Sequence, residues 1–312
     1  MASIFKALAR MPAPRFFYPD TPELPLPDKH RFPVSKYRLL REKVVSERLL
    51  GSATLLPSPP ASIEQLLRAH SAEYVTHTLN GTLGQKEQRR IGLPWSTTLV
   101  RRSRAAVGGS LAASREALVE GISGQLAGGT HHAHRDFGSG YCVFNDLAVA
   151  SLTLLAEGVV NRVAILDLDV HQGDGNAAIL SDESAVFVAS LHGEKNFPFR
   201  KVASDLDIGL ADGTEDEAYL TAVAEAYEAV TAFKPDLLLY LAGADPLDVD
   251  SLGRLSVSAD GLRRRDEYVL NQSRAIGCPI AIVAGGGYAK PISDTVNAYA
   301  ETWSAARRIY GL

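Results

Sequence analysis

Four short stretches in which almost every residue is apolar constrain the fold of this chain more than any other feature. They read RVAILDL, AVFVASL, DLLLYLA and PIAIVAG, at residues 162–168, 185–191, 236–242 and 279–285. Unbroken hydrophobicity over so few residues is typical of strands buried on both faces, as in a parallel sheet that helices cover. These stretches therefore predict four buried strands of a mostly parallel sheet.

Three longer segments have the pattern of helices: residues 101–121, 146–158 and 214–233. In the third segment Thr214 and Glu217 have the spacing of a capping box. Apolar residues then follow at helical spacing: Leu220, Val223, Tyr227 and Val230. Strands that alternate with helices predict α/β architecture, with a central sheet flanked by helices.

The composition fits one large domain that covers residues 1–312. Of these 312 residues, 46% are hydrophobic and 22% are charged, which is ordinary for a globular protein with a large core. The first 60 residues are rich in proline. We expect them to form irregular structure or short elements packed on this domain.

Charge and cysteine content exclude some classes of protein. A net charge of −4 and a pI near 6.1 leave no positive surplus for a phosphate backbone, so we expect no direct nucleic-acid binding. Two cysteines, Cys142 and Cys278, cannot make a disulfide framework and favour a reducing compartment. The N-terminal MASIFKALARMPAPRFF lacks the apolar run, roughly 7 to 15 residues, of a secretory signal. No segment approaches the ~20 apolar residues of a membrane span, so we expect a cytoplasmic protein.

Polar groups follow the apolar runs, where ligand sites of open α/β sheets gather. The first run leads into Asp167, Asp169 and His171, which a strand's period of two places on one face. The third run leads into Asp245, and the fourth leads into GGGY, residues 285–288. A further candidate is the pair of adjacent histidines in GGTHHA, residues 128–133.

Asp169, His171 and Asp245 suit a zinc ion, because two carboxylates and an imidazole leave a coordination position open for water or substrate. Taken alone, Asp-x-Asp-x-His could be a hydrogen-bonded loop entrance, and Asp245 could be a helix cap or a turn former. Several strand ends that deliver compatible groups to one place favour the metal site.

Five segments together resemble the zinc-dependent histone deacetylase family, which shares the arginase-like α/β fold with acetylpolyamine amidohydrolases. They are GGTHHAHRDFGSGYCVFND, ILDLDVHQGDGN, SLHGEKNFPF, LAGADPLDVDSLGRLSVS and AGGGY, in the order of the family. The similarity extends from about residue 15 to residue 305, and HRFPVSKY and HSAEYV also match. The compact length and the SLHGEKNFPF variant are most similar to the class IV and bacterial branch.

The resemblance implies a role for each matching residue. Asp169, His171 and Asp245 would hold the zinc, and His131 and His132 would each be hydrogen-bonded to a carboxylate, Asp167 and Asp174 respectively. The reaction implied is hydrolysis of an acyl amide on a lysine side chain.

His132 would then transfer the proton between water and the leaving amine, while His131 would act as an electrostatic or orienting partner. Tyr288 would donate its hydroxyl to the oxyanion, although a tyrosine after a glycine turn can also be merely packed. The histidine pair likewise has a structural alternative, with one ring buried and the other exposed on a loop.

The resemblance also implies a narrow apolar tunnel for the lysine stem. Gly140 and Tyr141 match one wall, either Phe197 or Phe199 is the candidate for the other, and Gly286 belongs to the glycine run that must approach the site closely. Many members carry a potassium ion, here matched to backbone oxygens of Asp167, Asp169, His171, Ser190 and Leu191. The remaining histidines are assigned to structural or surface roles, with His192 the least secure of them: His30, His70, His77, His134 and His192.

The expected substrate is an acyl-lysine protein or peptide, or a small acylated amine. Many members hold peptide backbone with an acidic residue on a rim loop, whereas the comparable stretch here, GQKEQRRIGLPWSTTLVRR, is predominantly basic. Three alternatives stay open: an acetylpolyamine amidohydrolase, a dimanganese ureohydrolase that uses Asp248 and Asp250 as extra ligands, and a non-catalytic binding module on the same scaffold.

Overall fold

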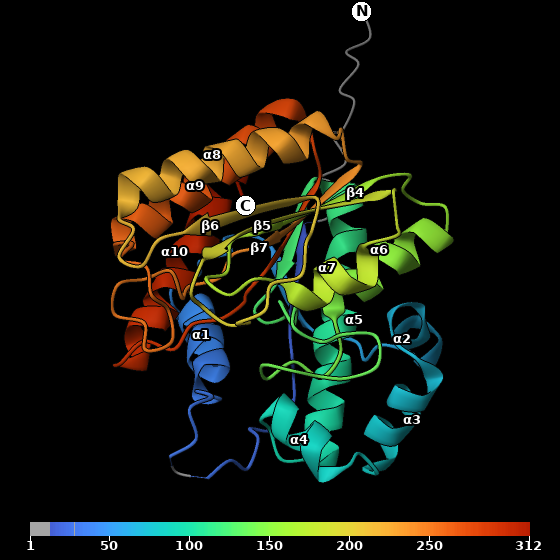
Figure 1. Cartoon of the computed structure of the whole chain (residues 1–312). Helices are drawn as coiled ribbons and strands as arrows, with labels where there is room; N and C mark the ends of the chain where they lie inside the picture. The colour runs from blue at the N-terminus through green and yellow to red at the C-terminus, as the bar shows by residue number, and fades with distance from the viewer. Residues whose placement is uncertain (1–12, 28) are drawn as a thin grey trace, which may run out of the picture.

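A single parallel sheet organises the computed structural model, which describes residues 13–27 and 29–312 (Figure 1). Within these residues the sheet has eight strands, in the order β2-β1-β3-β8-β7-β4-β5-β6, and every paired neighbour runs parallel. The strands are β1 (Arg15–Tyr18), β2 (Thr54–Pro57), β3 (Ile122–Gln125), β4 (Val163–Asp167), β5 (Val186–Gly193), β6 (Leu206–Leu210), β7 (Leu237–Leu241) and β8 (Ile280–Val283).

The four apolar runs form four adjacent strands, β8, β7, β4 and β5, so their prediction is confirmed. In β4 the alternation of side chains fills two cores at once. Ala164 and Leu166 belong to one core, and Val163 and Ile165 belong to the other. A strand with both faces buried gains from apolar residues at every position, which explains the unbroken hydrophobicity of these runs.

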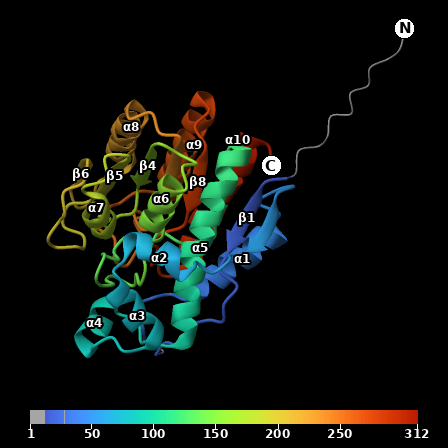
Figure 2. The same ribbon diagram turned by 90° about the vertical axis from the view of Figure 1, so that its right-hand side faces the viewer.

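Helices cover both faces of the sheet. In Figure 1, α8 and α9 lie on one side, and α5, α6 and α7 lie on the other. The helices are α1 (Ser35–Ser46), α2 (Ile63–Ala69), α3 (Ala72–Asn80), α4 (Gln85–Ile91), α5 (Thr97–Glu120), α6 (Asp146–Ala156), α7 (Asp174–Leu180), α8 (Asp216–Ala232), α9 (Ala259–Ile276) and α10 (Ile292–Tyr310). The predicted helices correspond to α5, α6 and α8. Figure 2 shows α3 and α4 gathered near one end of the long helix α5.

The sheet also contains strands that lie outside the four apolar runs. The strand β3 reads ISGQ, and its polar side chains are buried because each has a partner: Ser123 donates to Arg15 O at 2.6 Å, and Gln125 donates to Ala106 O at 2.8 Å. The proline-rich N-terminal part contains the short strands β1 and β2, as well as the twelve-residue helix α1. Residues 1–12, which include most of the stretch considered as a targeting signal, lie outside the described residues.

The predicted capping box of α8 is wrong. The helix is capped at Glu215 without a side-chain hydrogen bond, and Thr214 belongs to the preceding turn, where its hydroxyl donates to Ala211 O at 2.8 Å. Glu217 instead pairs with Arg264 at 2.7 Å. The preceding turn therefore engages Thr214, and α9 engages Glu217, so neither side chain caps the helix.

Because all strands are parallel, their carboxyl ends meet at one edge. The register aligns Asp167, the last residue of β4, with Ser190 in β5 and Leu241 in β7. The segments that follow β4, β7 and β8 therefore leave the sheet side by side. No helix in the described part of the chain has the length and apolar character needed to cross a membrane.

Candidate active site

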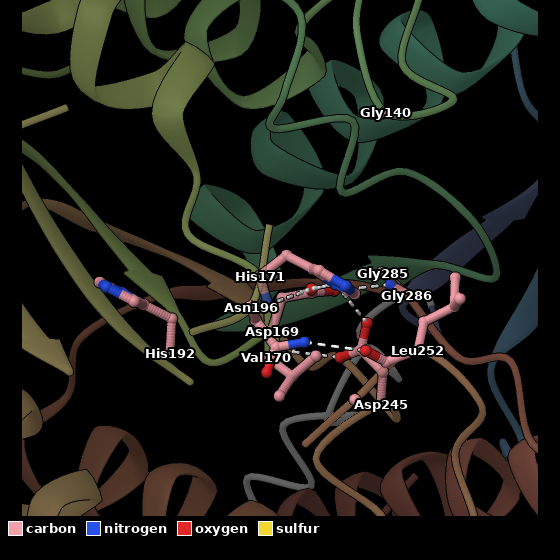
Figure 3. A network of polar contacts seen from close by, with 12 residues as sticks. Gly140, Asp169, Val170, His171, His192, Asn196, Asp245, Leu252, Gly285 and Gly286 are labelled. Atoms are coloured by element: carbon pink, nitrogen blue, oxygen red, sulfur yellow. Dashed lines mark hydrogen bonds and ion pairs between the residues drawn. The ribbon is translucent and has the colours of Figure 1, made fainter. Parts of the chain in front are cut away.

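Three side chains from two of these segments converge beyond the sheet. Asp169 and His171 follow β4, Asp245 follows β7, and one ligand-capable atom from each lies within 4.8 Å of the others. All three side chains are buried. Both carboxylates approach the same ring nitrogen, because Asp169 Oδ1 and Asp245 Oδ2 each lie 3.1 Å from His171 Nδ1 (Figure 3).

Backbone amides fix the outer oxygen of each carboxylate. Gly286 N donates to Asp169 Oδ2 at 2.6 Å, and Val170 N donates to Asp245 Oδ1 at 2.9 Å. A Cβ atom at Gly286 would lie 1.8 Å from Asp245 Oδ2, so only glycine allows this close approach. The glycine run after β8 therefore positions the carboxylates, as a shell of donors around metal ligands does.

This cluster fits a divalent cation. His171 Nδ1 carries at most one hydrogen, and two buried carboxylate oxygens face it. Asp169 Oδ1 also accepts a hydrogen bond from His171 N at 3.0 Å, whereas Asp245 Oδ2 has to share the single ring N–H. Buried carboxylates without sufficient donors are costly. Two oxygens and one nitrogen at this spacing suit zinc and leave a coordination position for a further ligand.

Two histidine–carboxylate pairs lie beside the cluster. His131 Nδ1 is 2.7 Å from Asp167 Oδ2, and His132 Nδ1 is 2.7 Å from Asp174 Oδ1. The two imidazole rings are 4.1 Å apart between centroids, and His132 lies 5.9 Å from the ring of His171. In the His132 pair, Nε2 is the nitrogen left to face a reactant, whereas His131 Nε2 lies 3.8 Å from Asp169 Oδ1.

The two rings differ in charge. Burial opposes charge on His131, but the carboxylates of Asp167 and Asp169 outweigh it and raise its pKa to about 9. Burial and the neighbouring charge of His131 lower the pKa of His132 to about 4, although Asp174 opposes the shift. The surroundings therefore favour the uncharged form of the His132 ring and the charged form of the His131 ring.

Tyr288 faces the cluster from the end of the glycine run. Its ring centroid is 6.4 Å from that of His171, and burial raises the pKa of its hydroxyl well above the ordinary value, so the group stays protonated. No hydrogen bond to a residue within the described ranges engages this hydroxyl. Asp250 Oδ2 accepts a hydrogen bond from Tyr288 N at 2.5 Å and so holds the backbone of this residue.

The candidate tunnel residues fall on different parts of the approach. Gly140 has a φ of 53°, and a Cβ atom there would lie 2.6 Å from His132 Cδ2. The ring of Phe197 is 4.9 Å from that of His132, whereas the side chain of Phe199 is 85% exposed. The ring centroid of Tyr141 lies 6.2 Å from that of Tyr288. The structure thus places Phe197 at the reactive groups and Phe199 at the outer surface.

Two cavities meet at this point. An outer groove of about 730 Å³ is open to solvent, and its lining includes His132, His171 and Tyr288. A small inner cavity of about 60 Å³ is lined by the same three residues together with His131 and Asp169. His132 therefore borders the solvent-facing side, whereas His131 borders only the inner cavity.

The other histidines hold the framework in place. His134 Nε2 lies 3.0 Å from Asp174 Oδ2, so it fixes the carboxylate that holds His132. Within β5, His192 is hydrogen-bonded to Ser190 at 3.0 Å, and its ring is directed away from the cluster (Figure 3). Backbone or side-chain hydrogen bonds engage the other three: His30, His70 and His77.

Sequence reasoning missed a buried lysine beneath the site. Lys36 in α1 is 2% exposed, and its ammonium group donates to Gly285 O at 3.1 Å and Gly287 O at 3.3 Å. It also lies 5.0 Å from the ring centroid of Tyr288. One lysine in a proline-rich segment carries no periodic signal, so only the packing of α1 against the glycine run identifies it.

The extra aspartates of the dimanganese alternative do not join the cluster. Asp248 is exposed. The carboxylate of Asp250 accepts hydrogen bonds from Leu252 N at 2.8 Å and Gly253 N at 2.9 Å, in addition to the bond from Tyr288. Within the described residues, Asp169, His171 and Asp245 form the one group with the spacing for a metal ion.

Comparison with known proteins agrees with this geometry. A model of the histone deacetylase domain matches residues 30–305. The chain belongs to the histone deacetylase family. It is 43% identical to an uncharacterized protein of Picosynechococcus, over 95% of this chain and 99% of that protein. It is also 31% identical to histone deacetylase 2 of Arabidopsis thaliana, over 86% of this chain and 73% of that protein.

A histone deacetylase-like amidohydrolase of Pseudomonas aeruginosa is 31% identical, over 81% of this chain and 71% of the relative. A solved structure of a histone deacetylase homologue from Aquifex aeolicus superposes with a TM-score of 0.79 at 23% identity, over 96% of this chain and 88% of the other. These similarities make the protein a hydrolase of this family with the deacetylase fold.

Proposed function

We propose that the protein is a zinc-dependent amidohydrolase that removes acetyl or longer acyl groups from lysine side chains. The observation that carries this proposal is the convergence of the Asp169, His171 and Asp245 cluster with two histidine–carboxylate pairs at the base of one groove. A binding module would not require this set of reactive groups.

Asp169, His171 and Asp245 would hold the zinc ion. When bound there, zinc supplies a Lewis acid that polarises the acyl oxygen and acidifies water. Val170 N and Gly286 N keep both carboxylates in position and so restrict the ion to one place.

The protein side chains would carry out the proton transfers. His132 has Nδ1 engaged by Asp174, so Nε2 would take the proton of the attacking water and later deliver it to the departing lysine nitrogen. His131 would act electrostatically, because its Nε2 is directed at Asp169 Oδ1, 3.8 Å away. Tyr288 would donate its hydroxyl to the oxyanion.

The remaining groups would bind the substrate. Gly140, Tyr141 and Phe197 would enclose the lysine stem, Gly286 would keep the inner end of the site narrow, and Phe199 would contact the surrounding peptide at the surface. The proposal includes a potassium ion held by backbone oxygens of β4, β5 and the segment after β4, supported by the pairing of Asp167 with Ser190. It also includes a cytoplasmic location, supported by the free cysteines Cys142 and Cys278.

One assay separates the candidate substrates. Zinc-loaded protein is incubated with acetyl-, octanoyl- and myristoyl-lysine peptides and, in parallel, with acetylputrescine. Hydrolysis of at least one peptide supports lysine deacylation, and its rates across the series give the preferred chain length. Exclusive hydrolysis of acetylputrescine would establish the small-amine alternative, and no hydrolysis of any amide would favour a binding module.

Metal analysis tests the ligand set independently. We expect one zinc per chain and loss of most zinc in Asp245→Ala, since two remaining ligands bind the ion weakly. The exposed Asp248→Ala should keep its zinc and serves as the control. Two zinc ions per chain at this place, or full occupancy in Asp245→Ala, would contradict the assignment.

A further inference from the structure

The rim of the outer groove carries a strong positive charge. Five exposed cationic side chains line it, and no aspartate or glutamate within the described ranges does so. The five cations come from the segment before α1, from α4, and from the segments after β5 and β7: Arg31, Arg89, Arg90, Lys195 and Arg254. The whole chain has a net charge of −4, so this concentration is local to the mouth of the site.

Few carboxylates neutralise the rim. Asp212 alone serves two of the cations, at 3.1 Å from Arg254 and 3.8 Å from Lys195. Arg89 and Arg90 form no ion pair with a carboxylate in the described part of the chain, and Arg90 stacks on Phe137 at 4.2 Å. The rim therefore keeps a surplus of positive charge next to a cleft whose size is typical of ligand sites.

This charge discriminates between the substrates that the proposed function allows. An acylated polyamine carries further ammonium groups, and a basic polypeptide tail carries lysine and arginine beside the acyl-lysine. Both would place like charges against the rim, which lowers association rates and raises the energy of the complex. An acidic segment would place carboxylates against the rim instead, and these would be attracted to it. The rim thus supplies both elements of charge discrimination, attraction of acidic substrates and repulsion of basic ones.

We propose that the preferred substrate is an acyl-lysine within an acidic polypeptide segment, and that the cationic rim disfavours acylated polyamines and basic tails. This inference rests on the proposed deacylase function and specifies its substrate class. The exposed ring of Phe199 provides an apolar contact beside the charges, so the rim suits a polypeptide better than a small anion.

The first experiment uses three peptides that share one acyl-lysine and differ only in the flanking residues, which are acidic, uncharged or basic. Acetylputrescine and free Nε-acetyl-lysine complete the set. We expect the lowest KM for the acidic peptide and the highest for the basic peptide. The difference should shrink as salt is raised, because screening weakens exposed charges.

The second experiment removes rim charges. Arg89→Gln and Arg254→Gln should each raise KM for the acidic peptide about two- to fivefold and lower it for the basic peptide. Lys86→Gln is the matched control, because Lys86 is an exposed cation on the same helix as Arg89 but does not line the groove. It should leave the ranking of peptides unchanged.

Binding of fluorescein-labelled peptides, followed by anisotropy, tests the charge preference even if none of them is hydrolysed. Equal affinity for acidic and basic peptides, or preference for the basic peptide or for acetylputrescine, would overturn the inference while leaving amide hydrolysis intact. Preference for free acetyl-lysine over every peptide would overturn the polypeptide part. Failure to hydrolyse any amide counts against the proposed function. The order of peptide affinities decides the charge preference separately.

Discussion

At the scale of single residues, the two adjacent histidines differ mainly in what lies around them. Each uses Nδ1 to bind a carboxylate at 2.7 Å. His132 lines the outer groove, whereas His131 lines only the inner cavity and lies close to Asp167 and Asp169. Access to substrate, rather than the hydrogen-bonding pattern, is therefore what separates the roles proposed for the two rings.

Replacing each histidine tests these roles. His132→Ala should keep fold and zinc but lose turnover about 10²–10⁴-fold, the usual contribution of a positioned acid or base. His131→Ala should lose less. Steady-state kinetics with matched zinc analysis measures both, and the exposed His77→Ala is the control. If His131→Ala is the more severe variant, the two roles must be exchanged.

Removing the hydroxyl of Tyr288 tests the oxyanion donor. Tyr288→Phe preserves the ring packed near Tyr141 and His171, so zinc content and unfolding temperature should not change. Because the hydrogen bond is stronger in the transition state, kcat should fall about 10²–10³-fold with little change in KM. A kcat within about threefold of the parent enzyme would assign Tyr288 a packing role.

At the scale of secondary structure elements, α1 supports the glycine run after β8, although the two lie far apart in the sequence. Lys36 lies on this helix and binds two carbonyls of the glycine run, which itself follows β8. Arg265 on α9 supports the segment after β7 in the same way, because it donates a hydrogen bond to Gly243 O at 2.6 Å, shortly before Asp245 in the chain. Helices far from the site in sequence thus fix the glycine-rich segments that carry its groups.

Lys36→Met tests this support. Loss of two hydrogen bonds should let the glycine run move and shift Tyr288, so kcat should fall about 10- to 100-fold while KM changes little. Lys36→Arg keeps a donor and should recover much of kcat, and Lys43→Met on the same helix is the control. A Lys36→Met enzyme with normal kcat, or equal losses in both Lys36 variants, would show that the charge does not position the site.

At the scale of the whole molecule, β1 and α10 lie far apart in the sequence but pack against each other. Phe16 in β1 is fully buried and packs edge-on to Trp303 in α10, at 6.0 Å between ring centroids. Arg15 Nε donates to Glu116 Oε2 in α5 at 2.8 Å. We therefore propose that residues 1–312 unfold as one domain that includes the proline-rich part.

Denaturant unfolding measured by far-UV circular dichroism and by tryptophan fluorescence should give one coincident transition. Phe16→Ala should lower the free energy of unfolding by about 3–5 kcal/mol, because it leaves a cavity between β1 and α10. Phe199→Ala, at an 85% exposed position, should change it by less than about 0.5 kcal/mol. Two separate transitions would instead make the N-terminal part an independent unit.

The central strands and the reactive groups that follow them can be predicted from the amino-acid sequence alone. An apolar run such as 162–168 specifies a buried strand within seven residues, and parallel strands bring their carboxyl ends together, so Asp169, His171 and Asp245 could be expected at one place. Each of these features is carried by a short stretch of sequence, and the general behaviour of parallel sheets is enough to bring them together.

Features that depend on partners far away in the sequence can be recognised only in the folded chain. The strand β3 has buried polar side chains that are stable because Arg15 and Ala106 accept their hydrogen bonds. The different positions of Phe197 and Phe199, the burial of Lys36 and the charge of the rim likewise depend on how separate segments pack together. A single residue carries no local signal of such a meeting, because the free energy of a contact belongs to both partners and their packing.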